Sequence, residues 1–77
     1  MPRSLRSPRH EALRAFLVER RKAAGLTQAV LAERLKIHRS YVADIERGQR
    51  RVDVVELFAL AEAIGFDPGE AIERMKG

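Results

Sequence analysis

The middle of the chain carries two runs of apolar residues at helical spacing, separated by a short break. The apolar positions are Leu31, Leu35, Ile37, Val42 and Ile45. The helical period holds up to Leu35 and begins again at Val42, so residues 27–48 predict two short amphipathic helices that share one small core. Ala32 stands where these helices would cross, and its small side chain favours a close approach of their axes.

A longer helix is expected before this pair, over residues 8–24. Ser7 and Pro8 form a helix start, because serine caps free amides and proline lacks an N–H that would otherwise stay unbonded. Gly25 predicts a left-handed end to the helix. The inward stripe is expected to contain Leu13, Phe16, Leu17 and Ala24.

Two further helices are expected in the last third of the chain. Asp53 and Glu56 form an acidic capping box that starts a helix near residue 54, and Gly65 ends it. The apolar stripe of this helix is expected to contain Val54, Leu57, Phe58, Ala61 and Ile64. An Asp-Pro pair then opens a short last helix over residues 69–75.

Together these segments predict an all-α, compact five-helix domain over residues 8–77. Thr27 is expected to cap the second helix, and the third helix is expected over residues 39–47. Residues 1–7 show no periodic face and are expected to form a disordered basic arm. Basic arms of this kind can enter a minor groove, but an untidy terminus explains the same composition.

The amino-acid composition argues against several classes of protein. The chain has no cysteine and only two histidines, which are far apart in the sequence, so neither a thiolate nucleophile nor a metal site is expected. No nucleophile with a matched base and no glycine-rich phosphate loop is present, so neither an enzyme nor a cofactor is expected. No apolar run is long enough to span a membrane. A cytoplasmic protein without a membrane partner is the expectation.

The charge is divided unevenly along the chain. Residues 1–51 hold 13 Lys and Arg against 5 Asp and Glu, a balance of +8, whereas residues 52–77 hold 2 against 6, a balance of −4. The basic part contains the predicted helix pair. A polyanion would bind that part and release counterions, so its binding would weaken steeply with salt.

Two short motifs resemble those of a known family. The segments GLTQ at residues 25–28 and IERG at residues 45–48 resemble the Cro and phage-repressor type helix-turn-helix proteins (XRE family), with a likeness over roughly residues 11–66. The resemblance implies a lambda-repressor-like fold whose third helix enters the major groove of double-stranded DNA. It also implies a bacterial or phage-type transcription regulator at the nucleoid, a repressor or autoregulator that binds an inverted repeat as a homodimer.

The same resemblance implies which side chains touch the bases. It places Arg39, Ser40 and Asp44 at base-contacting positions, and Ala43 could pack on a thymine methyl group. Arg39 could donate two bonds to guanine O6 and N7. Asp44 would either accept from cytosine N4 or orient Arg39, and the sequence leaves both interpretations open.

Contacts to DNA phosphates are expected at the start of the second helix and around the end of the third. The residues are Thr27, Gln28, Tyr41, Arg47, Gln49, Arg50 and Arg51. Without the motif, the segment RGQRR at 47–51 would be only a solvated loop.

Other positions are expected to support the scaffold. By resemblance, Glu46 forms a partly buried ion pair with Arg21 and does not touch DNA. Lys36 stands where the family usually has a left-handed glycine, and His38 where serine or threonine commonly caps the recognition helix. The corner between the two helices is therefore expected to be strained or altered.

The apolar residues near the end of the chain suggest how copies could associate. Phe66, Ile72 and Met75 are candidates for a dimer surface, and filling the monomer's own core is an equally good interpretation. No separate ligand-sensing domain and no small-molecule ligand are expected. The alternative function is an antitoxin or co-regulator that acts mainly as a protein-interaction module.

Overall fold

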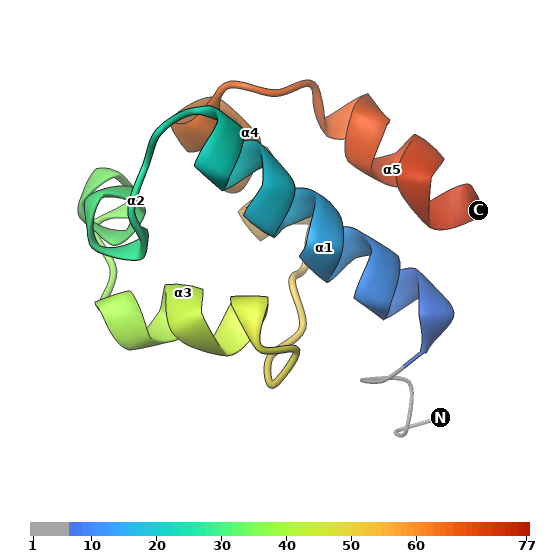
Figure 1. Cartoon of the computed structure of the whole chain (residues 1–77), viewed down its shortest axis with the longest axis horizontal. Helices are drawn as coiled ribbons and strands as arrows, with labels where there is room; N and C mark the ends of the chain where they lie inside the picture. Colours follow the sequence, from blue (N-terminus) through green and yellow to red (C-terminus); the bar gives the residue numbers. More distant parts are fainter. Residues whose placement is uncertain (1–6) are drawn as a thin grey trace.

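The computed structural model describes residues 7–77, so most of the arm predicted over residues 1–7 lies outside the described residues. Within them the chain forms five α-helices and no strand (Figure 1). The helices are α1 (Pro8–Ala23), α2 (Gln28–Leu35), α3 (Arg39–Glu46), α4 (Val54–Ile64) and α5 (Pro68–Lys76). The predicted all-α, five-helix fold is confirmed, with helix ends that differ from the expected ones by one residue.

The helix starts follow from local side-chain capping. Ser7 Oγ accepts from the His10 amide at 3.1 Å, and Thr27 Oγ1 accepts from the Val30 amide at the same distance. At α4 the capping box is complete, because the Asp53 side chain accepts from the Glu56 amide and the Glu56 side chain accepts from the Asp53 amide. Each cap satisfies an amide that the helix itself leaves unbonded.

The corner between α2 and α3 keeps helix-turn-helix geometry without a glycine. Lys36 adopts the left-handed conformation, with φ 59° and ψ 42°, and is the only non-glycine residue with positive φ among residues 7–77. The Lys36 amide donates a hydrogen bond to Glu33 O, and the Ile37 amide donates one to Ala32 O. These two hydrogen bonds together define a Schellman motif. His38 then caps α3, because its Nδ1 accepts from the Ser40 amide at 3.1 Å.

The helices pack around α1. Figure 1 shows α1 running through the centre of the molecule, and α1 contacts both α3 and α5. Helix α2 packs against α3 and α4. Phe16, Leu31 and Val42 are the largest fully buried side chains, and Ala32 is buried between α2 and its neighbours as its size predicted.

Several residues expected in the core are exposed. Val54 is 68% exposed and Phe58 is 55% exposed, although the predicted stripe of α4 included both. Helix α4 instead buries Leu57, Leu60, Ala61 and Ile64, which leaves positions 54 and 58 at the edge of the buried stripe. Ala24 and Ile37 are also exposed, since both lie just beyond a helix end.

The three candidates for a dimer surface have different environments. Phe66 is buried, and its ring meets the ring of Phe16 edge to face with centroids 5.0 Å apart. Met75 is half-buried and packs against the core, whereas Ile72 is 46% exposed. Assigning Phe66 to a dimer surface is therefore wrong, because the monomer's own core takes up this side chain.

A buried ion pair joins the end of α3 to α1. Arg21 Nε lies 2.6 Å from Glu46 Oε2, and Arg21 Nη2 lies 3.0 Å from Glu46 Oε1, with both side chains about nine-tenths buried. The remaining guanidinium nitrogen, Nη1, donates to Leu26 O at 2.7 Å. The pair that the family resemblance implied is present, and Arg21 also fixes the segment that leads into α2.

Two further side chains, one on α2 and one on α1, donate to the carboxylate or the backbone oxygen of Glu46. Gln28 Nε2 at the start of α2 donates to Glu46 Oε1 at 2.8 Å, and Arg14 Nη1 of α1 donates to Glu46 O at 2.7 Å. Charged groups that leave water need such partners, because an unpaired buried charge is strongly destabilising. The network around Glu46 therefore holds α1, α2 and α3 in one arrangement.

The left-handed Lys36 should respond to a glycine substitution. A residue with a Cβ is disfavoured in this conformation, so we expect Lys36→Gly to raise the free energy of unfolding by about 0.5–1 kcal/mol. Ala24→Gly is the matched control, since Ala24 also follows a helix but has φ −82° and should lose stability. Urea unfolding followed by circular dichroism measures both. Equal effects of the two changes would contradict the strain at Lys36.

Loss of the buried pair should lower the free energy of unfolding far more than loss of a surface pair. We expect Glu46→Ala to lower the free energy of unfolding by about 3–5 kcal/mol, because Arg21 stays buried without its counter-charge. Glu19→Ala is the control: it breaks an exposed pair with Arg74, whose Nη1 lies 3.2 Å from Glu19 Oε1, and should cost at most about 1 kcal/mol. The same urea titration compares them, and similar losses would show that the buried pair does not hold the scaffold.

Candidate nucleic-acid interface

The first turn of α3 presents an exposed polar face. Arg39 and Ser40 are exposed, whereas Val42 and Ile45 on the opposite side of the helix are buried. Within residues 7–77 the side chain of Arg39 makes no hydrogen bond or ion pair. The two aliphatic side chains fix the helix from behind, so the guanidinium of Arg39 is free to meet an outside partner.

Ser40 is oriented by the residue that caps the helix. Its Oγ lies 2.9 Å from His38 Nδ1, which also accepts from the Ser40 amide. His38 therefore holds both the backbone and the hydroxyl of Ser40 in place, and it fills the capping role for which serine or threonine is common.

Asp44 does not orient Arg39. Asp44 forms an ion pair with Arg47, one turn further along the chain, and the Asp44 side chain is 40% exposed. The interpretation in which Asp44 braces Arg39 is therefore wrong, because the nearer arginine takes its carboxylate. The pair also neutralises part of the charge of Arg47, and Ala43 beside it is half-buried.

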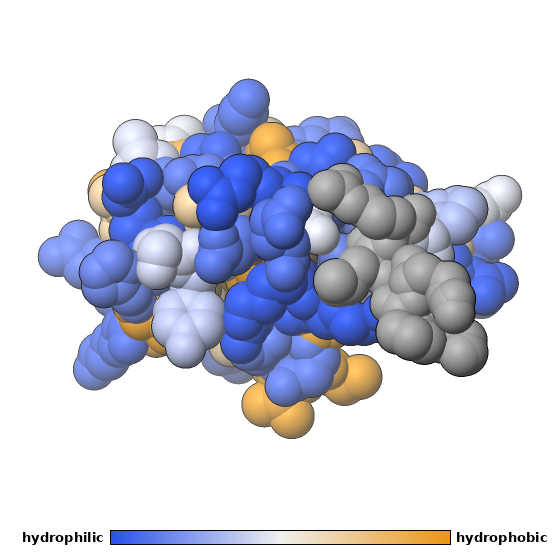
Figure 2. All heavy atoms as spheres, turned by 90° about the horizontal axis from the view of Figure 1, so that it is seen from below, coloured by the Kyte–Doolittle hydropathy of each residue, from blue (hydrophilic) through white to orange (hydrophobic). Residues whose placement is uncertain are grey.

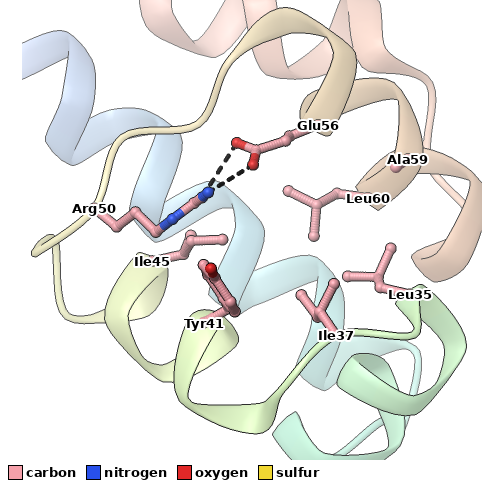
Figure 3. A pocket seen from close by; sticks show the side chains of 8 residues that line it. All are labelled: Leu35, Ile37, Tyr41, Ile45, Arg50, Glu56, Ala59 and Leu60. Carbon is pink, nitrogen blue, oxygen red and sulfur yellow. Dashed lines mark hydrogen bonds and ion pairs between the residues drawn. The ribbon is translucent and has the colours of Figure 1, made fainter.

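Arg50 is bound within the protein. Its Nη2 lies 2.8 Å from Glu56 Oε2 and its Nη1 lies 3.2 Å from Glu56 Oε1, so the guanidinium and the carboxylate pair as two forks. The guanidinium carbon also lies 4.8 Å from the centroid of the Tyr41 ring (Figure 3). Arg50 thereby connects Tyr41 on α3 to Glu56 on α4.

The pairing changes the titration of both groups. The hydrogen bonds from Arg50 lower the pKa of the Glu56 carboxyl and outweigh its partial burial, and the Asp53 amide acts in the same direction. The hydrogen bond to Glu56 raises the pKa of Arg50. Because the folded state lowers the pKa of this carboxyl, the pair stabilises the fold at pH values above the ordinary pKa of glutamate. This stabilisation is lost as the pH falls through the lowered pKa. Near neutral pH the pair is fully formed.

Sequence reasoning missed this contact. It assigned Glu56 to the capping box alone, whereas Glu56 Oε1 accepts from the Asp53 amide and from Arg50 together. Arg50 and Glu56 are six residues apart with a loop between them, and this spacing fits no helical pairing rule. The partner of Arg50 is therefore seen only in the folded loop.

The other expected phosphate-contacting residues lie at the start of α2 and in the loop that follows α3. Gln28 donates its side-chain amide to Glu46, and Thr27 uses its hydroxyl to cap α2. Gln49 and Arg51 are exposed in the loop that follows α3. Figure 2 looks at the molecule from the side on which α3 lies in Figure 1, and the surface there is predominantly hydrophilic.

Two other kinds of feature are not found in the described part of the chain. Residues 7–77 contain no group of three or more His, Asp or Glu side chains that could hold a metal ion. Among the same helices, none is long and apolar enough to cross a membrane.

Known proteins resemble this chain in sequence. A helix-turn-helix family model matches residues 17–70. Control protein C.BamHI of Bacillus amyloliquefaciens is 32% identical over 50 residues, which are 65% of this chain and 62% of that protein, so the match spans less than two thirds of that relative. An uncharacterised HTH-type transcriptional regulator, y4dJ of Sinorhizobium fredii, is 35% identical over 52 residues, 68% of each chain.

Solved structures agree with the sequence matches. An XRE-family like protein from Pseudomonas syringae pv. tomato has a TM-score of 0.86 and 36% identity, covering 97% of this chain and 92% of its own. The restriction-modification controller protein C.AhdI from Aeromonas hydrophila has a TM-score of 0.74 and 40% identity, covering 80% and 94%. Three of these similar proteins are named as control, controller or regulator proteins, in agreement with the expectation that the chain is not an enzyme. With a family model matched over most of its length and relatives of the same shape, this chain belongs to the XRE-type helix-turn-helix family of DNA-binding transcription regulators.

Proposed function

We propose that this regulator binds an inverted-repeat DNA operator as a homodimer, with α3 of each copy in the major groove. The observation that carries the proposal is the exposed guanidinium of Arg39, which has no hydrogen-bond or ion-pair partner among residues 7–77 and stands at the start of a short helix whose inner side Val42 and Ile45 hold in the core. The major groove admits one α-helix, and residues at the N-terminal end of that helix meet the base edges.

The bases are read by four side chains of α3. Arg39 donates two bonds to guanine O6 and N7, and the Ser40 hydroxyl, oriented by His38, bonds to a neighbouring base. Ala43 packs on a thymine methyl group. Asp44 keeps its ion pair with Arg47 and accepts from cytosine N4 through a carboxylate oxygen.

The affinity comes mainly from phosphates on either side of the reading helix. The start of α2, with Thr27 and Gln28, approaches one stretch of backbone through its free amides. Arg47, Gln49 and Arg51 approach the other stretch from the end of α3 and the loop behind it. Tyr41 and Arg50 contribute as a stacked pair whose charge is shared with Glu56.

Two of the similar proteins are named as control or controller proteins, which supports a role in regulating transcription. The competing role is an antitoxin or co-regulator that acts through proteins alone. Selection of bound sequences from a random duplex pool separates the two, because a regulator enriches one motif and an interaction module enriches none. An inverted repeat with half-sites about 10 base pairs apart is the expected motif.

Arg39→Ala should remove specificity and keep general DNA binding. We expect the change to lower affinity for the selected operator by about 1–3 kcal/mol, since a bidentate contact to guanine is lost, and to leave affinity for random duplex nearly unchanged. Arg51→Ala is the contrasting variant and should weaken both equally, with a salt slope about one unit shallower. Fluorescence anisotropy over a salt series measures both variants. If both lower the two affinities alike, the division between base and phosphate contacts is wrong.

A further inference from the structure

The cap of α3 fixes the tautomer of His38. His38 ends the corner that joins α2 to α3 (Figure 1), and its Nδ1 lies 3.1 Å from the Ser40 amide nitrogen. A backbone amide only donates, so Nδ1 must accept and carries no hydrogen. The one N–H hydrogen of the neutral ring therefore sits on Nε2.

The tautomer of His38 fixes the direction of a second hydrogen bond. Ser40 Oγ lies 2.9 Å from the same Nδ1. Two acceptors this close would repel each other, so the Ser40 hydroxyl must donate its single hydrogen to Nδ1. The oxygen keeps its lone pairs, and Ser40 thus meets any further partner as an acceptor only.

No other side chain competes for the Ser40 hydroxyl. Among residues 7–77, Ser40 Oγ bonds to His38 and to no other residue. Both side chains are exposed, whereas Val42, two residues further along α3, is buried in the core. The lone pairs of Ser40 are therefore open to an outside partner in the same exposed turn as Arg39.

A histidine at this position differs in kind from the usual cap. A serine or threonine hydroxyl both donates and accepts, so it sets no direction for a neighbouring hydroxyl. The Nδ1 of the Nε2–H tautomer only accepts. The departure at residue 38 from the serine or threonine common in this family therefore alters the chemistry of residue 40 as well as the cap.

The edges of the bases divide into two classes that such a residue can separate. In the major groove adenine N6 and cytosine N4 donate, whereas guanine O6 and thymine O4 accept. A serine whose hydroxyl rotates freely bonds to either class. An acceptor-only serine bonds to the amino group of adenine or cytosine, but its lone pairs face those of the keto oxygen in guanine or thymine.

We propose that His38 restricts Ser40 to accepting hydrogen bonds, so that Ser40 selects an amino base, adenine or cytosine, over a keto base, guanine or thymine, on the strand that it faces. The inference rests on the proposed function, because it needs the first turn of α3 in the major groove. His38 is here a positioning residue, since it works through Ser40 without touching a base itself. Arg39 has only donors, so the two adjacent residues select opposite classes of base.

The first half of the proposal is tested on the free protein. Two-bond ¹H–¹⁵N correlation spectra of the labelled full chain at about pH 8, where imidazole is ordinarily neutral, distinguish the two tautomers of a histidine ring. The signals that disappear in His38→Ser belong to His38, because His10 is the only other histidine. We expect the Nε2–H tautomer for His38. The Nδ1–H tautomer, or equal amounts of both, overturns the proposal.

The second half is tested with the duplex that the protein selects from a random pool. Each position of the half-site is changed to all four bases, and the position at which Ser40→Ala abolishes the preference is the one that Ser40 reads. There the parent should bind duplexes with adenine or cytosine about 3- to 10-fold more tightly than those with guanine or thymine, as expected for one hydrogen bond. Fluorescence anisotropy measures the four dissociation constants.

His38→Ser is the matched variant, because serine retains the cap and leaves the Ser40 hydroxyl free to turn. Its four dissociation constants at this position should agree within about twofold, while the preference for guanine at the position read by Arg39 stays as in the parent. Circular dichroism checks that every variant is folded.

Three results overturn the role of His38. They are a parent that prefers guanine or thymine at this position, a His38→Ser variant that keeps the parent's preference, and a half-site in which no position responds to Ser40→Ala. Each leaves the proposed function standing, because the protein still selects a DNA sequence. A parent that selects no sequence overturns the proposed function, and the base preference with it.

Discussion

The arrangement of the helices depends on the buried pair between Arg21 and Glu46. Glu46 is the last residue of α3, and its carboxylate and backbone oxygens receive bonds from α1 and from the start of α2. Apolar packing alone could hold these short helices at many angles, whereas a two-fork ion pair has one geometry. The pair is costly to bury, and its burial is offset by hydrogen bonds, since no buried side-chain nitrogen or oxygen among residues 7–77 lacks a partner. It therefore fixes the direction in which α3 faces outward.

Local rules predicted much of this fold. Ser7, Thr27 and Asp53 cap their helices as the sequence indicated, because a capping side chain bonds to amides only two or three residues away. Such contacts are encoded within a few residues and need no knowledge of the rest of the chain. The corner at Lys36 is different, because only the family resemblance placed a left-handed residue there and the sequence left open whether the turn was strained or altered; the structure keeps the left-handed conformation.

Contacts between elements that are distant in the chain could not be predicted from the sequence. The exposure of Phe58, the burial of Phe66 and the pairing of Arg50 all depend on which helix lies opposite, and periodicity does not encode that. The candidate site shows the same division. The free position of Arg39 follows from the helical phase of Val42 and Ile45, but the partner of Asp44 depended on a choice between two arginines. Only the folded structure shows that Arg47 is the partner of Asp44.

The proposed function depends on the same ion pair, because a helix that enters a DNA groove needs a scaffold that fixes its orientation and an outer face that stays exposed. The most direct test is a map of backbone amide shifts in ¹⁵N-labelled protein titrated with the duplex that the protein itself selects. The account predicts that the largest changes fall in the first turns of α2 and α3 and in the loop at residues 47–51. Changes concentrated on α5 and the outer side of α1, with α3 unaffected, would contradict it.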